Sequence, residues 1–176
     1  DRVIYCPRGK VLGGSSSVNA MLYTRGTPSD YDHWASLGNE GWGYKDILPY
    51  FKSTQHQERG ASEYHGNEGE LNVAEGRSNH PLGKTLLEAC NQAGYTNNSD
   101  LNGVQQEGVG YYQFNIKNGK RHCAAEAFIW PIKNRKNLTV ITGAHACGIE
   151  WEVDKAVGIT YLNEQGSKLR VDAARE

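Results

Sequence analysis

The sequence has no two cysteines at close spacing. Its four cysteines form no Cys-x-x-Cys pair, which argues against a structural zinc site and against thioredoxin-type chemistry. They are Cys6, Cys90, Cys123 and Cys147. No group of His, Glu and Asp residues has the spacing of metal ligands either, so no metal is expected. Free and mostly buried thiols are the simpler interpretation, and they fit an intracellular location, cytoplasmic or peripheral to an inner membrane.

An excess of charge of one sign and a long hydrophobic run are also missing. The 19 Lys and Arg residues nearly balance the 20 Asp and Glu residues, so no surface for nucleic acid is expected. No apolar stretch is long enough for a transmembrane helix, and no signal peptide is recognisable. Apolar residues make up only 38% of the chain, which starts at Asp1 and stops in a charged stretch. These features predict a piece of a longer protein.

Two helices are expected in the first third of the chain. The run Thr27–Asp30 is a helix start, because the threonine can cap the helix and the aspartate can return a bond to the cap. This helix should run to Leu37 and stop at Gly38. A second helix is expected over residues 44–54, with Pro49 inside it as the site of a kink or a break.

The remaining elements mix short helices and strands. A third helix should begin at Asn79-His80-Pro81 and stop at Gly94, and further helical turns are expected over 18–23 and 122–130. The expected strands are 3–6, 71–73, 111–117, 138–142, 146–152, 156–162 and 168–171. The strands of the C-terminal part, from 138–142 to 168–171, should form an antiparallel meander. Without a regular βαβ rhythm, the pattern predicts an α/β fold in which helices and strands are mixed.

The loop of residues 8–19 is the strongest local feature. Gly13 and Gly14 let the backbone approach a flat or charged ligand, and three serines follow them. Free N–H groups at a helix start there would favour a phosphate or an electron-rich ring. Both a cofactor or phosphate loop and a simple tight turn fit the pattern. The order of Gly, Lys and Ser excludes a Walker loop.

The run PRGKVLGGSSSVNAMLYTRG, residues 7–26, resembles the first signature of the glucose–methanol–choline (GMC) oxidoreductases. The similarity covers nearly the whole chain in family order, through residues 30–52, 64–73, 102–113, 119–131 and 137–146. Within this family the sequence looks most like the choline dehydrogenases and related FAD-linked alcohol dehydrogenases.

The resemblance implies a chain organisation and a chemistry. Residues 1–70 would form the FAD-binding region with its flavin-facing loop, and residues 71–124 would start the substrate-binding region. Residues 125–176 would return to the FAD-binding domain with the β-meander. The family transfers a hydride from an alcohol carbon to FAD, so the expected partners are a small-molecule alcohol and an electron acceptor, either oxygen or a quinone.

The resemblance also implies which residues contact FAD. Val11, Gly13, Gly14 and Ser15 would lie along the cofactor. Asn19, Ala20, Met21 and Leu22 would lie by the isoalloxazine ring, and the backbone of Ala146 would lie at the adenine side. Some members tether the flavin through a histidine at the position of Val18, so FAD is expected to be non-covalent here. Considered without the motif, Asn19 would be a helix cap and Ala146 an ordinary strand residue.

Two parts of the family's machinery are not expected in this chain. The Gly-x-Gly-x-x-Gly fingerprint should lie upstream of Asp1. The most similar run in this chain is Gly108-Val109-Gly110, but no helix is expected to begin after it. The catalytic pair of the family, a His with a second His or Asn, should lie downstream, so no catalytic residue is expected. The six histidines are read as structural or exposed: His33, His56, His65, His80, His122 and His145. The alternatives are a fragment without FAD binding or activity, and an acetylglucosamine- or phosphate-binding module.

Overall fold

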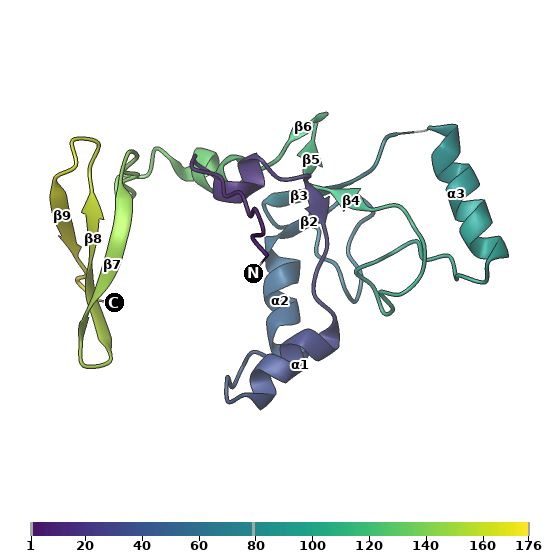
Figure 1. Ribbon diagram of the computed structural model, residues 1–176, viewed down its shortest axis with the longest axis horizontal. Helices are drawn as coiled ribbons and strands as arrows, with labels where there is room; N and C mark the ends of the chain where they lie inside the picture. Colours follow the sequence, from purple (N-terminus) through teal and green to yellow (C-terminus); the bar gives the residue numbers. More distant parts are fainter. Residues whose placement is uncertain (1, 79, 176) are drawn as a thin grey trace. The chain divides into compact units, whose positions relative to one another are not determined.

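The computed structural model describes residues 2–78 and 80–175. The chain divides into two compact units, Asp1–Ile132 and Lys133–Glu176. Both sheets and helices are present, which confirms the mixed α/β class (Figure 1).

The first unit contains a sheet with the strand order β1-β4-β3-β2. The strands are β1 (Leu22–Tyr23), β2 (Gln55–Gln57), β3 (Leu71–Glu75) and β4 (Gln113–Phe114). Strands β2 and β3 are parallel, and the other pairs are antiparallel. A separate hairpin joins β5 (Ile116–Lys117) to β6 (Lys120–Arg121) through Asn118 and Gly119, which both have the positive φ that an Asn-Gly hairpin turn requires.

The three longer helices agree with the sequence. Helix α1 (Pro28–Ser36) has the expected capping box, in which the Thr27 amide donates to the Asp30 carboxylate at 2.6 Å. Helix α2 (Tyr44–Thr54) continues through Pro49. Helix α3 (Pro81–Gln92) is capped by His80, and the expected start at Asn79 lies outside the described residues. The positive φ of Gly38 and Gly94 fits their expected role at the helix ends.

Several short elements differ from expectation. Residues 3–6 form no strand, and Val3, Ile4 and Tyr5 are exposed. Residues 18–23 are not helical, because the tight turn comes earlier, in a 3-10 helix η1 (Gly14–Ser17), and β1 follows. The serine hydroxyls of this turn bond to nearby carbonyls, which competes with a regular helix.

Other predicted elements are shortened or missing. The strand expected over 111–117 is reduced to β4 and β5, and the strand expected over 138–142 is wrong. The helical segment near residue 125 consists of a π-helical turn η2 (Ala125–Ile129) and a 3-10 turn η3 (Trp130–Ile132).

The second unit is the antiparallel meander that the sequence predicted. Its strands β7 (His145–Glu152), β8 (Lys155–Leu162) and β9 (Lys168–Asp172) pair in chain order. The register sets Ile149 opposite Ile159 and Ile159 opposite Val171. Cross-strand apolar pairs of this kind stabilise an antiparallel sheet.

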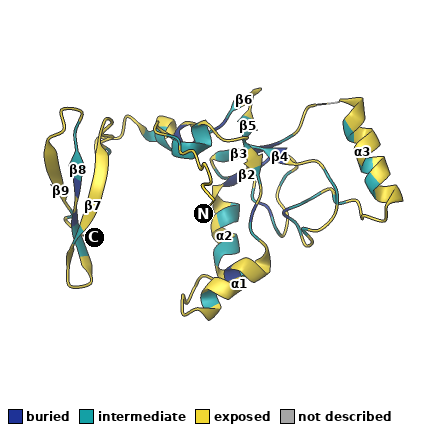
Figure 2. Ribbon diagram, viewed as in Figure 1, coloured by how far each residue is buried: buried dark blue, intermediate teal, exposed yellow. Residues whose placement is uncertain are grey.

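Few of the described residues are buried (Figure 2), and more of the buried side chains are polar than apolar. The buried apolar residues are Tyr31, Val73, Ala74, Ala125 and Ala127. The buried polar residues are Arg25, Gln55, Gln57, His65, Asn72, Asn102, Gln113, His122 and Thr160. Buried polar groups must be hydrogen-bonded to be tolerated, so directed contacts hold the first unit together as much as apolar burial does.

Arg25 is the centre of this polar interior. Its side chain donates from Nη1 to the Tyr64 carbonyl at 2.8 Å and from Nη2 to Gln55 Oε1 at 2.6 Å. Its Nε donates to the Tyr23 hydroxyl at 3.2 Å, and its backbone amide donates to Asn102 Oδ1 at 2.8 Å. One residue therefore joins β1, β2 and two loops.

A hydrogen-bonded chain extends this cluster. The Gln55 side chain also bonds to His65 Nδ1 at 3.0 Å, and His65 Nε2 lies 2.9 Å from Asp100 Oδ2. Asp100 Oδ1 in turn accepts from the Asn102 amide. His65 is 4% exposed and is hydrogen-bonded to β2 and to the loop that contains Asp100, so its role is structural.

Replacing Arg25 by lysine should destabilise the fold strongly. Lysine cannot reproduce the planar set of donors, so buried acceptors such as Gln55 Oε1 would lose their partners. We expect R25K to lower the free energy of unfolding by roughly 2 kcal/mol or more, measured by urea denaturation of the full-length protein.

The matched control is R59K. Arg59 pairs with Glu75 at 2.7 Å, but both side chains are 40% exposed, so this substitution should cost less than about 1 kcal/mol. Equal effects of R25K and R59K would contradict the central role of Arg25.

Candidate functional site

The glycines of the loop at residues 8–19 have distinct structural roles. Gly13 and Gly14 both have positive φ, 88° and 56°. A Cβ atom on Gly13 would clash with the Ser17 hydroxyl, and one on Gly9 would clash with the Gly14 carbonyl. A Cβ atom on Gly14 would meet nothing within 4 Å. The loop is therefore tightly packed at Gly9 and Gly13, where a side chain would clash, and open at Gly14.

The serine hydroxyls fasten this loop to itself and to η2. Ser15 Oγ accepts from the Gly9 amide at 3.2 Å, and Ser17 Oγ donates to the Leu12 carbonyl at 2.8 Å. Ser16 Oγ donates to the Gly13 carbonyl and accepts from the Ala124 amide at 2.9 Å. The three hydroxyls thus serve first to fix the backbone.

The segment after the serines has a constrained backbone. Met21 has a φ of 64°, which is rare for a residue with a side chain. Its amide donates to Asn19 Oδ1 at 3.0 Å, and its carbonyl accepts from the Asn115 amide at 2.8 Å. Asn19 therefore acts as a local cap for Met21, and the segment keeps one conformation.

Arg121 holds the same segment from the side of β6. Its Nη1 donates to the Ser16 carbonyl and to Asn19 Oδ1, both at 2.9 Å, and its Nη2 donates to the Asn19 carbonyl at 2.8 Å. The sequence reasoning did not single out this arginine. The one sequence feature that pointed to Arg121 was its position in residues 119–131, a run that resembles the GMC family.

The segment of residues 11–22 carries apolar side chains that the chain leaves uncovered. They are Val11, Leu12, Val18 and Leu22, all exposed. An open glycine in a segment with uncovered apolar groups fits a flat ring system, because such a ring needs close backbone approach and apolar contact. The residues present therefore fit a flavin.

The remaining predicted contact, Ala146, belongs to the second unit. It lies in β7, is exposed, and is paired with Tyr161 of β8. The other eight predicted contacts, from Val11 to Leu22, lie in one continuous stretch of sequence in the first unit.

The thiol of Cys123 lies against this loop. Burial raises the pKa of Cys123, but the polar groups beside its sulfur, the Ser17 side chain and the amides of Glu126 and Ala125, lower it by more, so the pKa lies below the usual value. The expectation of mostly buried thiols is wrong, because Cys6 and Cys147 are exposed and Cys90 and Cys123 are half-buried.

His122, next to this cysteine, has a structural contact. Its Nδ1 accepts from the Asn72 amide of β3 at 3.1 Å. Burial lowers the pKa of His122, and the nearby Lys117 lowers it further. A neutral imidazole is needed for Nδ1 to accept, so this histidine fastens β3 to the segment after β6.

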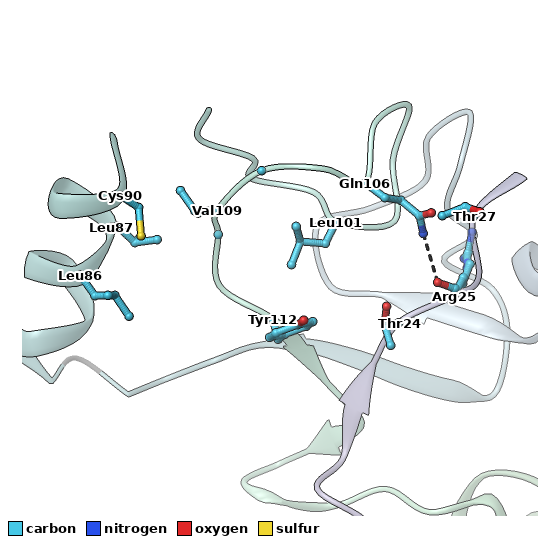
Figure 3. A pocket seen from close by; sticks show the side chains of 12 residues that line it. Thr24, Arg25, Thr27, Leu86, Leu87, Cys90, Leu101, Gln106, Val109 and Tyr112 are labelled. Atoms are coloured by element: carbon cyan, nitrogen blue, oxygen red, sulfur yellow. Dashed lines mark hydrogen bonds between the residues drawn. The ribbon is translucent and has the colours of Figure 1, made fainter. Parts of the chain in front are cut away.

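A separate cavity of about 450 Å³ lies between α3 and the loop of residues 101–112 (Figure 3). Leu86, Leu87 and Cys90 of α3 line it together with Leu101 and Gln106. The Gln106 amide nitrogen donates to the Arg25 carbonyl at 3.1 Å. None of the predicted FAD contacts lines this cavity.

Two further observations concern the described residues as a whole. Within residues 2–78 and 80–175, no cluster of three or more His, Cys, Asp or Glu side chains could hold a metal ion. No helix in the described part of the chain has both the length and the apolar character needed to cross a bilayer.

Comparisons with known proteins show the family to which the chain belongs. Residues 1–176 match the family model described as GMC oxidoreductase, so the chain belongs to the GMC oxidoreductase family. It is 45% identical over 175 residues to the mitochondrial choline dehydrogenase of Homo sapiens, covering 99% of this chain and 29% of that protein. It is 44% identical over 165 residues to the alcohol dehydrogenase (acceptor) of Pseudomonas putida, covering 93% and 30%.

A solved structure has a similar fold. The FAD-dependent oxidoreductase from Chaetomium thermophilum matches with a TM-score of 0.86 and 25% identity, covering 96% of this chain and 32% of that one. The resemblance to the GMC family and to its choline and alcohol dehydrogenases is thus confirmed. The chain spans about a third of the length of the relatives that it matches.

The lowered pKa of Cys123 predicts its reactivity. Because the thiolate is the nucleophile, alkylation of Cys123 should remain fast at a pH below about 8.5, where an ordinary thiol is mostly protonated. The measurement is the pH dependence of iodoacetamide labelling, followed by mass spectrometry of the peptide that contains Cys123. The same peptide in urea-unfolded protein is the control, and its midpoint should be higher. A folded midpoint equal to or above the unfolded one would contradict the stabilised thiolate.

Proposed function

We propose that the complete protein oxidises the CH–OH group of a small alcohol to an aldehyde, using FAD. The observation that carries the proposal is the open backbone at Gly14, in a segment with uncovered apolar side chains, in a chain of the GMC family. The names of the relatives, choline dehydrogenase and alcohol dehydrogenase, support an alcohol as substrate.

FAD would lie along the loop where it is open at Gly14. When bound, it supplies the acceptor for the hydride that leaves the alcohol carbon. Val11, Gly13, Gly14 and Ser15 would contact it along its length, Asn19, Ala20, Met21 and Leu22 would surround the isoalloxazine ring, and the Ala146 backbone would contact the adenine side. The fixed conformation at Asn19 and Met21 supports this role, because a preorganised backbone binds a rigid ring without an ordering cost.

The apolar residues of the loop would have a second task. Val18 and Leu22 are exposed at present and would be covered by the ring, which excludes water from one face of the flavin. Val18 carries only an alkyl side chain and offers no nucleophile for a tether. We therefore propose non-covalent FAD.

The rest of the proposal follows the organisation of the family. Residues 1–70 and 125–176 would serve the FAD-binding domain, and residues 71–124 would start the substrate-binding region. The dinucleotide fingerprint and the catalytic histidine would lie outside residues 1–176. The electron acceptor would be oxygen or a quinone, and the location cytoplasmic or peripheral to a membrane.

Residues 1–176 alone are proposed to lack activity and FAD binding. Their polar interior and their exposed apolar side chains support this view, because so little apolar surface is buried. The loop of residues 8–19, without a site for the pyrophosphate, would also have few contacts with the cofactor.

The substitution G14A tests where FAD lies. The new methyl group would project into the space assigned to the cofactor, so the purified full-length protein should lose most of its flavin absorption per polypeptide. The control is G38A, because Gly38 also has a positive φ and also has nothing within 4 Å of a Cβ atom. Both variants place a methyl group on a residue with positive φ, so G38A controls for the effect of such a backbone position. Full flavin content in G14A would count against the proposed site.

Acid precipitation tests the mode of attachment. If FAD is held without a covalent bond, trichloroacetic acid should release all of the yellow colour into the supernatant, because denaturation removes every contact. The mass of the precipitated polypeptide should then equal that of the unmodified chain. Colour that stays in the washed pellet would overturn the non-covalent assignment.

A further inference from the structure

Arg121 makes more contacts with the flavin-facing segment than any residue outside that segment for which a contact is described. Three hydrogen bonds of 2.8–2.9 Å join its guanidinium to Ser16 and Asn19, across more than 100 residues of sequence. The other contacts of this segment are mostly local, such as those between Ser17 and Leu12 or Met21 and Asn19. The loop therefore depends on Arg121 for its attachment to the hairpin β5–β6.

These bonds also set the direction of the peptide groups. The carbonyls of Ser16 and Asn19 both point to Arg121, and the peptide bonds are trans. In a trans peptide, the carbonyl of one residue and the N–H of the next point to opposite sides. The N–H of Ala20 is therefore turned away from Arg121, and Ala20 is exposed.

The positive charge of Arg121 is a second feature, besides its hydrogen bonds, that can act on a group bound at this segment. Among the described residues, no carboxylate forms an ion pair with this guanidinium, which is half-buried. Its partners are neutral oxygens, so its positive charge is not cancelled. A cation held beside a segment favours the more negative form of a nearby group.

We propose that Arg121 is a positioning residue for the flavin: it fixes the Asn19–Ala20 peptide so that the Ala20 N–H faces the ring, and its charge favours the reduced, anionic cofactor. This inference rests on the proposed function, in which FAD lies on the loop. Arg121 itself would act through Ser16 and Asn19 and would need no contact with the substrate.

The test compares R121Q and R121K in the full-length holoprotein. R121Q loses the charge and most of the donors, so the dissociation constant of FAD should rise by about tenfold or more, and the flavin midpoint potential should fall. R121K keeps the charge but not the paired donors. It should weaken FAD binding while shifting the potential less than R121Q does.

The control is R59Q, which removes an arginine with comparable contacts, to Glu75 and to Ser99, that does not touch the loop. Its FAD affinity and potential should remain those of the parent. If R121Q fails to fold, R121K and its potential carry the test. Unchanged affinity and potential in the foldable Arg121 variants would overturn the proposal.

The variant G14A separates the two possible failures. If G14A loses FAD while the Arg121 variants behave like the parent, the flavin site stands and the role of Arg121 is wrong. If G14A keeps its FAD and the Arg121 variants behave like the parent, both proposals are overturned.

Discussion

The buried guanidinium of Arg25 is the contact on which the first unit depends. Removing a charged group from water is unfavourable unless its donors are satisfied, and here they are satisfied by oxygens and by an aromatic face. The hydroxyl of Tyr23, the side chain of Gln55 and the carbonyl of Tyr64 accept from it, and the Phe51 ring lies 5.0 Å from the charge. Three separate segments are thereby held around one side chain.

The segment of residues 16–25 is held by hydrogen bonds of two arginines. Arg25 fixes the chain after β1, and Arg121 fixes it before β1, at Ser16 and Asn19. Between them, Met21 bonds to Asn115 and keeps its unusual φ. A loop that is fastened at both ends loses little conformational freedom when a ligand arrives, which is the physical basis of preorganised binding.

Much of the fold could be predicted from the sequence, because local rules decide it. The capping box at Thr27, the stop at Gly38 and the turn at Asn118-Gly119 each require only neighbouring residues. The strand β2 could not be predicted, since Gln-His-Gln has no apolar alternation and is paired only through its parallel partner β3.

The residues of the candidate site also differ in whether the sequence alone identifies them. The glycines and serines of the loop could be found because they are consecutive. Arg121 could not be assigned a role, because its partners are backbone carbonyls and a side-chain oxygen more than 100 residues away. The burial of Arg25 also runs against the usual exposure of arginine, and only the folded arrangement supplies its acceptors.

The long sequence separation of these contacts has a consequence for biosynthesis. Residues 8–19 leave the ribosome early, but Ser16 receives its bonds from Arg121 and from the Ala124 amide, 105 and 108 residues later. Synthesis proceeds at roughly 5–20 residues per second, so the nascent loop waits several seconds for these partners. The loop therefore receives these bonds only after the β5–β6 hairpin and Ala124 have been synthesised, and a ligand that requires the finished loop would bind after that point.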